Sequence, residues 1–204
     1  MTTMQATFEA WNRAAFAALA AGTAPSPASL AFARALANWA IYATPVALVA
    51  LWLAGGTAQR RAAVGAAASG VLALASGAAA GAAFVHARPF MLGLSPNFLD
   101  HAPDNSFPSD HATLAFAVAF ALWSAGRRGP AAALTALGAA IGWARVFLGA
   151  HFPADVLGAA AIALVCAPVF AQGPGRAVRD LVADVGERIW DGALARVGAR
   201  RRSV

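Results

Sequence analysis

Apolar runs long enough to cross a bilayer are the feature that most constrains this chain. A spanning helix needs about 20 mostly apolar residues to cross a hydrocarbon core about 30 Å thick. Lipid offers the backbone no hydrogen-bond partners, so such runs must be helices packed into a bundle. We therefore predict an all-α, polytopic membrane helical bundle of five or six spans. The five predicted spans are residues 30–54, 62–85, 111–126, 130–150 and 153–171.

The scarcity and position of the charges support a membrane protein. Charged residues make up only 12% of the 204 residues, against about 25% in soluble domains. The net charge of +6 would suit a nucleic-acid-binding protein, but the arginines lie beside apolar runs and in the tail, as basic flanks of spans do. We therefore expect no nucleic-acid partner. The single cysteine, Cys166, excludes an intramolecular disulfide and a multi-cysteine metal site.

Two flanking segments enclose a membrane core of residues 30–172. Within residues 1–29, positions 5–22 have the pattern of an amphipathic helix, which either lies on the membrane surface or makes a short sixth crossing. Residues 173–204 alternate charged and apolar side chains and predict a basic tail helix that ends in three arginines at positions 200–202.

The arginines predict which side of the membrane each loop occupies. If the spans alternate in direction, the basic loops and the tail share one side, which the positive-inside rule makes cytoplasmic. The loop 86–110 and the turn at His151 then lie on the outer face. The arginines in the two basic loops are Arg60, Arg61, Arg127 and Arg128.

Three short polar stretches fall on that outer face, each at the end of a predicted span. They are residues 86–90 (HARPF), 107–113 (FPSDHAT) and 145–155 (RVFLGAHFPAD). Ionisable residues within membrane segments are costly, and so they mark functional sites. We predict that these stretches meet in one site.

The third stretch has the spacing of an oriented nucleophile. Arg145 would cost about 2.5–3.5 kcal/mol at the bilayer centre, so we expect it to reach the interface or an anion. Pro153 suits the first turn of a helix, which puts His151 just before that helix and Asp155 in its opening turn. At this spacing a carboxylate can bond one imidazole nitrogen and leave the other free to attack.

The second stretch repeats this arrangement at a second helix start. A helix N-terminus presents free N–H groups to an anion, and Ser109 can cap the helix or donate to a phosphate oxygen. His111 stands at the same mouth, where it can protonate a leaving oxygen. Arg88 and Arg145 can clamp the charge of a transferring phosphoryl group.

Together the stretches resemble the three motifs of the type 2 phosphatidic acid phosphatase superfamily, KxxxxxxRP, PSGH and SRxxxxxHxxxD. The resemblance covers about residues 30–170 and implies the helical core that this superfamily shares with vanadium haloperoxidases. The matching residues are Arg88 and Pro89 for the first motif, Pro108, Ser109 and His111 for the second, and Arg145, His151 and Asp155 for the third.

Within the superfamily, the chain is most similar to bacitracin-resistance-type undecaprenyl-diphosphate phosphatases in size, in the PSDH form of the second motif and in the acidic approach HAPDNSFPSD. That resemblance implies hydrolysis of undecaprenyl diphosphate to undecaprenyl phosphate and phosphate. It also implies a bacterial inner (plasma) membrane protein with its active site on the outer or periplasmic face and its C-terminus in the cytoplasm.

The resemblance also implies a role for each matched residue. His151 would be the nucleophile that becomes phosphohistidine, with Asp155 orienting it. His111 would be the general acid and later the base that activates water. The phosphate would be bound by Arg88, Ser109 and Arg145.

The chain departs from the family pattern at three positions. The family lysine would fall at Gly81, the serine before the third-motif arginine is Ala144, and Asp110 replaces the usual glycine. His86 or Arg34 could supply the missing cation. We keep His86 and Asp110 as auxiliary site candidates.

Simpler interpretations compete for some of these residues. His86 and His101 could be interfacial polar residues, and Asp110 could be a carboxylate that stabilises a helix N-terminus. His111, His151 and Asp155 could instead bind a metal, but two neighbouring arginines suit a bound anion better. We therefore expect no metal and no other cofactor.

The alternatives for function follow from the same residues. The mechanism could act on phosphatidic acid, phosphatidylglycerol phosphate or lipid A phosphate, or the chain could be a non-catalytic lipid-binding membrane protein. In each case the expected partners are membrane lipids and an isoprenoid or other lipid phosphate.

Overall fold

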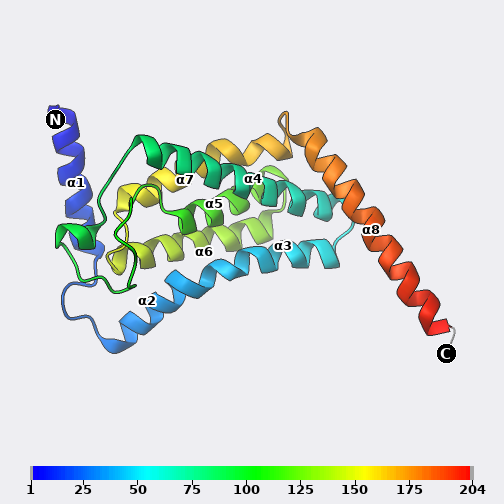
Figure 1. The fold of residues 1–204 in the computed structure, drawn as a ribbon, viewed down its shortest axis with the longest axis horizontal. Helices are drawn as coiled ribbons and strands as arrows, with labels where there is room; N and C mark the ends of the chain where they lie inside the picture. The colour runs from blue at the N-terminus through cyan, green and yellow to red at the C-terminus, as the bar shows by residue number, and fades with distance from the viewer. Residues whose placement is uncertain (1, 203–204) are drawn as a thin grey trace.

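The computed structural model describes residues 2–202, with side chains described as far as residue 196. In this part of the chain every regular element is a helix (Figure 1), which confirms the predicted all-α class. The elements are α1 (Thr3–Leu19), α2 (Pro27–Trp39), η1 (Ala40–Tyr42), α3 (Ala43–Ala54), α4 (Thr57–Ala83), η2 (Pro89–Leu92), α5 (Asp110–Ser124), α6 (Arg128–Phe147), α7 (Pro153–Ala171) and α8 (Arg176–Arg202).

Four helical segments within the described residues are long and apolar enough to cross a membrane. They are Pro27–Ala54, which joins α2, η1 and α3, then α4, α6 and α7. The fifth predicted span is helix α5, which has only 15 residues and is largely buried. The chain is therefore a multi-pass membrane protein, and the predicted spans agree closely with the helices.

Helix α5 is the centre of the bundle, with α4, α6 and α7 packed around it. Small side chains make this packing close. The buried face of α4 includes Gly70 and Gly77, and a Cβ added at Gly70 would come within 2.9 Å of Leu114 on α5. Without a hydrophobic driving force between helices in lipid, such close approach supplies the attraction.

The two ends of the bundle differ in composition. At one end lie α1, the long connection between α4 and α5 (residues 84–109) and the turn between α6 and α7. At the other end, α8 crosses the bundle (Figure 1) and forms ion pairs with α4. Arg61 Nη2 lies 3.0 Å from Asp184 Oδ1, and Arg60 Nη1 lies 3.7 Å from Glu187 Oε1. The basic loops and the basic helix thus share one end, as the sequence predicted.

Helix α1 packs against the opposite end and does not run alongside the other helices (Figure 1). Its buried residues are Asn12 and Phe16, and the Phe16 ring lies 5.3 Å from that of Phe152. The stripe that makes this segment amphipathic in the sequence is exposed instead, with Phe8 55% and Trp11 46% accessible. The side of α1 that touches the bundle is therefore not its apolar stripe.

Candidate active site

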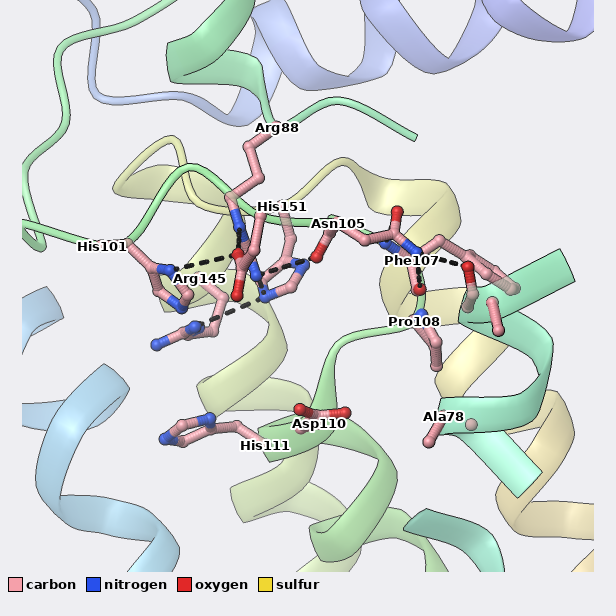
Figure 2. Close-up of a pocket in the computed structure, with 14 residues that line it drawn as sticks. Ala78, Arg88, His101, Asn105, Phe107, Pro108, Asp110, His111, Arg145 and His151 are labelled. Carbon is pink, nitrogen blue, oxygen red and sulfur yellow. Dashed lines mark hydrogen bonds and ion pairs between the residues drawn. The ribbon is translucent and has the colours of Figure 1, made fainter. Parts of the chain in front are cut away.

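The three polar stretches meet at the α1 end, around a cavity of about 420 Å³. One wall is the small-residue face of α4 at Gly77 and Gly81. The other walls bring together Arg88, Arg145 and His151, and Figure 2 shows these side chains converging above the start of α5. The predicted meeting of the three stretches therefore occurs in the structure.

His151 lies in the turn between α6 and α7 and is only 2% exposed. Its Nδ1 is 2.8 Å from the carbonyl oxygen of Ser106. A carbonyl only accepts, so Nδ1 carries the proton, and Nε2 presents its lone pair to the cavity. Burial lowers the pKa of His151 to about 4, and the charges of Arg145 and Arg88 act in the same direction. The imidazole is therefore neutral near pH 7.

Two guanidinium groups lie beside Nε2 of His151. Arg88 Nη1 is 3.1 Å away and Arg145 Nη2 is 3.4 Å away. Arg88 is held by the protein itself: its Nε donates to Asp104 Oδ1 at 2.7 Å, and its Nη1 and Nη2 donate to the carbonyls of Ala150 and Asn105. Arg88 is thus a fixed part of the wall.

Arg145 is different, because no described carboxylate is paired with it, and Asp104 and Asp110 act on it only from farther away. It is 4% exposed, its Nε has no hydrogen-bond partner, and no carboxylate described in the structure lies within ion-pair distance. A buried charge without a partner costs several kcal/mol. An anion in the cavity, next to Nε2 of His151, would supply the missing partner.

Asp155 stands in the first turn of α7 and is fully buried. Its Oδ2 accepts from the Phe152 backbone N–H at 2.7 Å and from the Ser106 hydroxyl, and it lies 3.6 Å from His151 Nδ1. The sequence predicted a direct bond from His151 to Asp155. The Ser106 carbonyl, at 2.8 Å, is the nearer partner and takes the Nδ1 proton, while the Ser106 hydroxyl donates to Asp155.

The start of α5 forms the floor of the cavity. Asp110 and His111 occupy its first turn and line the cavity, with His111 on the far side of Arg145 from His151 (Figure 2). Ser109 is the N-cap residue; it is fully buried next to the cavity without lining it, and its hydroxyl has no hydrogen-bond partner among the described residues. An unpaired buried hydroxyl at a helix N-terminus can donate to an anion.

The structure separates the auxiliary candidates. Asp110 lines the cavity, whereas His86 does not; it lies behind Asp155. Arg34 donates to the Phe98 carbonyl at 2.8 Å, also outside the cavity. His101, for which an interfacial role was the simpler interpretation, is in the cavity wall. Burial lowers the pKa of His101, with a further contribution from Arg88 and Arg145.

The missing family lysine has a steric explanation. A Cβ at Gly81 would come within 2.7 Å of the Phe107 carbonyl oxygen and 3.1 Å of Asn105 Nδ2. Asn105 Nδ2 donates to the Gly81 carbonyl at 2.7 Å and to the Phe107 carbonyl at 3.0 Å. The approach to α5 therefore occupies the space in which a lysine side chain would begin.

Sequence reasoning missed Asn105 and Ser106. Both lie in the approach to α5, which the sequence presents as an acidic segment. Asn105 makes its bonds to backbone carbonyls, and Ser106 acts partly through its own carbonyl. The sequence shows them only as two adjacent polar residues shortly before a helix start. That pattern does not indicate which groups their side chains and carbonyls contact.

Among the described residues, no group of three or more His, Cys, Asp or Glu side chains is arranged to hold a metal ion. His111, His151 and Asp155, the rival metal set, therefore do not form such a cluster.

Comparisons with known proteins relate the chain to a family. The family model described as the PAP2 superfamily matches residues 61–179. YbjG of Escherichia coli (strain K12), to which undecaprenyl-diphosphatase activity is provisionally assigned, is 38% identical over 149 residues, or 72% of this chain and 74% of YbjG. The undecaprenyl-diphosphatase BcrC of Bacillus subtilis (strain 168) is 32% identical, over 66% of this chain and 69% of its own length.

A third relative has a different name. The bacitracin transport permease protein BcrC of Bacillus licheniformis is 31% identical over 65% of each chain. Among solved structures, Aquifex aeolicus LpxE matches with a TM-score of 0.57 and 22% identity, over 72% of this chain and 87% of LpxE. The LpxE comparison supports the fold alone.

The close contact of the α5 approach with Gly81 can be tested by comparing Gly81→Ala with a control, Gly129→Ala. By helix propensity alone, Gly→Ala should stabilise a helix by up to about 1 kcal/mol. Gly129 of α6 has open space around it, so Gly129→Ala should leave the melting temperature unchanged or raise it. Gly81→Ala should displace the Asn105–Phe107 backbone and lower the melting temperature by more than about 2 °C. Thermal unfolding in one detergent measures both, and equal shifts would contradict the close contact.

Proposed function

The chain belongs to the PAP2 superfamily, and from that membership and the cavity we propose that it is a membrane lipid phosphatase that hydrolyses undecaprenyl diphosphate to undecaprenyl phosphate and phosphate. Two relatives bear the name undecaprenyl-diphosphatase, which supports this substrate. The enzyme is then a hydrolase of phosphoric anhydrides or esters that uses a phosphohistidine intermediate.

One observation carries the proposal. The buried guanidinium of Arg145 lacks a counter-charge within the described residues, and it lies 3.4 Å from the lone-pair nitrogen of a neutral histidine. A phosphoryl group at this place would neutralise Arg145 and present its phosphorus to Nε2 of His151. Arg88 supplies a second fixed cation beside it.

The proposed reaction has two steps. In the first, Nε2 of His151 attacks the terminal phosphorus, the bond from phosphorus to the bridging oxygen breaks, and His111 gives that oxygen its proton. In the second, His111 takes a proton from water, the water oxygen attacks the phosphohistidine, and the N–P bond breaks to release phosphate and regenerate His151.

The surrounding residues stabilise the charges in both steps. Arg88, Arg145 and Ser109 hold the equatorial oxygens of the phosphoryl group. Asp155, 3.6 Å from Nδ1, offsets the positive charge that His151 gains when Nε2 is phosphorylated. The Ser106 carbonyl holds the Nδ1 proton throughout.

The two histidines should respond differently to substitution. His151→Ala should reduce turnover to below about 1% of wild type, since loss of a nucleophile typically costs several orders of magnitude. His111→Ala should be severely impaired on an alkyl phosphate and much less so on an aryl phosphate, whose leaving group needs no proton. Phosphate release by purified protein measures both. Turnover by His151→Ala above a few per cent removes His151 from its role, and equal losses for His111→Ala on both esters remove the general acid.

The same site could act on phosphatidic acid, phosphatidylglycerol phosphate or lipid A phosphate. A diphosphate asks less of the general acid, because its leaving group is a phosphate monoester and not an alkoxide. We expect kcat/KM for a long-chain polyprenyl diphosphate to exceed that for phosphatidic acid by at least about tenfold, or roughly 1.4 kcal/mol in the barrier. Parallel assays in one detergent test this, and an equal or reversed preference would favour a phospholipid substrate.

A transport or lipid-binding role is the alternative from a different class, and the name of the Bacillus licheniformis relative is consistent with it. The phosphate-release assay also separates these classes. A folded wild-type protein that releases no phosphate from any of these lipids would favour the non-catalytic role.

We further propose that the α1 end of the bundle faces the outside of the bacterial inner membrane and that α8 is cytoplasmic. The basic loops and α8 at the other end support this under the positive-inside rule. In a Cys166→Ala background, Ala58→Cys and Ala177→Cys should be shielded from an impermeant thiol reagent in intact cells, and Ser95→Cys should be labelled. The reverse labelling pattern would put the cavity on the cytoplasmic face.

A further inference from the structure

His86 has no part in the proposed reaction, yet it contacts Asp155, the carboxylate that lies 3.6 Å from Nδ1 of the proposed nucleophile. It follows the last turn of α4, with its ring 4.9 Å from that of Phe152. Its Nδ1 lies 3.2 Å from Asp155 Oδ1, and its Nε2 lies 3.7 Å from Glu9 Oε2 of helix α1. His86 therefore lies between a buried carboxylate and a carboxylate of the N-terminal helix.

The backbone fixes the place of His86. Its N–H donates to Asn105 Oδ1 at 2.8 Å, and its carbonyl accepts from the Ser106 N–H at 2.8 Å. Ser106 also holds Nδ1 of His151 and donates to Asp155. The same short segment thus positions both histidines relative to Asp155.

His86 completes the hydrogen bonding of the Asp155 carboxylate. Oδ2 of Asp155 accepts from Phe152 and Ser106, while Oδ1 accepts from His86. Asp155 is fully buried, so without His86 its Oδ1 would be a buried acceptor with no protein donor. Leaving such a group unsatisfied is costly, and rotation of the carboxylate would relieve that cost at the expense of its 3.6 Å approach to His151 Nδ1.

Helix α1 contacts both His86 and the start of α7. Glu9 and Asn12 are three residues apart and so share one face of the helix. Asn12 Oδ1 accepts from the Ala154 N–H at 3.0 Å, in the first turn of the helix that carries Asp155. The hydrogen bond to Asp155 and the charge of Glu9 raise the pKa of His86, while burial and Arg13 oppose the shift.

We propose that His86 is a positioning residue that donates through Nδ1 to Asp155 and has Glu9 within ion-pair distance of its Nε2. Helix α1, which carries Glu9, thereby contributes to the positioning of the proposed active site. This inference rests on the proposed function, because it assigns His86 to the alignment of the proposed nucleophile. Among the described residues, the hydrogen bonds and ion pairs of the His86 side chain go to Asp155 and Glu9 and not to Arg88 or Arg145, so its loss should lower kcat and leave KM nearly unchanged.

Substitution of His86 by asparagine or glutamine tests whether Nδ1 or Nε2 of the imidazole is the nitrogen required for activity. The side-chain nitrogen of asparagine can take the place of Nδ1, and that of glutamine the place of Nε2. His86→Asn should keep kcat within about threefold of wild type, whereas His86→Gln and His86→Ala should lower it at least about tenfold, with KM changed less than about threefold. Glu9→Gln should have a smaller effect, about two- to fivefold on kcat.

Steady-state kinetics on a polyprenyl diphosphate, with single-turnover formation of phosphohistidine, measure these effects. Melting temperature in the same detergent shows whether each variant is folded. His86→Asn guards against a fold defect in the alanine variant, because it retains a polar side chain with an N–H donor. Equal losses for Asn and Gln, or a change in KM with kcat intact, would overturn the proposal.

The result separates this proposal from the proposed function. A wild-type protein that forms no phosphohistidine on His151 and hydrolyses no lipid phosphate would overturn the function itself. A wild-type protein that does both, beside a His86→Ala variant with unchanged kcat, would overturn only the role of His86.

Discussion

Two guanidinium groups buried beside one imidazole are the constraint on which the α1 end of this bundle depends. Arg88 is neutralised and held by Asp104 and by two carbonyls, from Ala150 and Asn105. Those carbonyls belong to the two connections that enclose the cavity, so Arg88 joins one connection to the other. Arg145 has no carboxylate within ion-pair distance among the described residues, and His151 lies within reach of both cations. The helices form the frame of the cavity, and the hydrogen bonds of Arg88 hold the two loops that close it.

Much of the fold could be predicted from the sequence, because length and apolarity alone identify a helix that crosses lipid. The four long segments and the short central helix follow the predicted spans closely. The contact face of α1 could not be predicted in this way. The amphipathic pattern predicts a helix on the membrane surface or a sixth crossing and does not say which residues meet the bundle. Asn12 and Phe16 make that contact, and Asn12 Oδ1 accepts from the Ala154 N–H.

The residues of the candidate site could be predicted from the sequence, but their hydrogen-bond partners could not. Spacing relative to helix starts brought Arg145, His151 and His111 to one mouth, and the family resemblance identified there is confirmed by the comparisons. The bond of His151 to the Ser106 carbonyl was not predictable, because it depends on the path of an irregular loop. The loss of the lysine at Gly81 needed the structure too, since the obstacle is a backbone carbonyl.

The shortness of α5 restricts how this protein can adapt to its membrane. At about 1.5 Å per residue, its 15 residues span roughly 22 Å, less than the hydrocarbon core of about 30 Å. The cavity lined by Arg88, Arg145 and His151 lies at its N-terminal end (Figure 2). The outer helices can lengthen or tilt as bilayer thickness changes, whereas one more turn at the start of α5 would fill the cavity. Adaptation to bilayers of different thickness is therefore expected in the outer helices, whereas the length of the central helix α5 is fixed by the cavity.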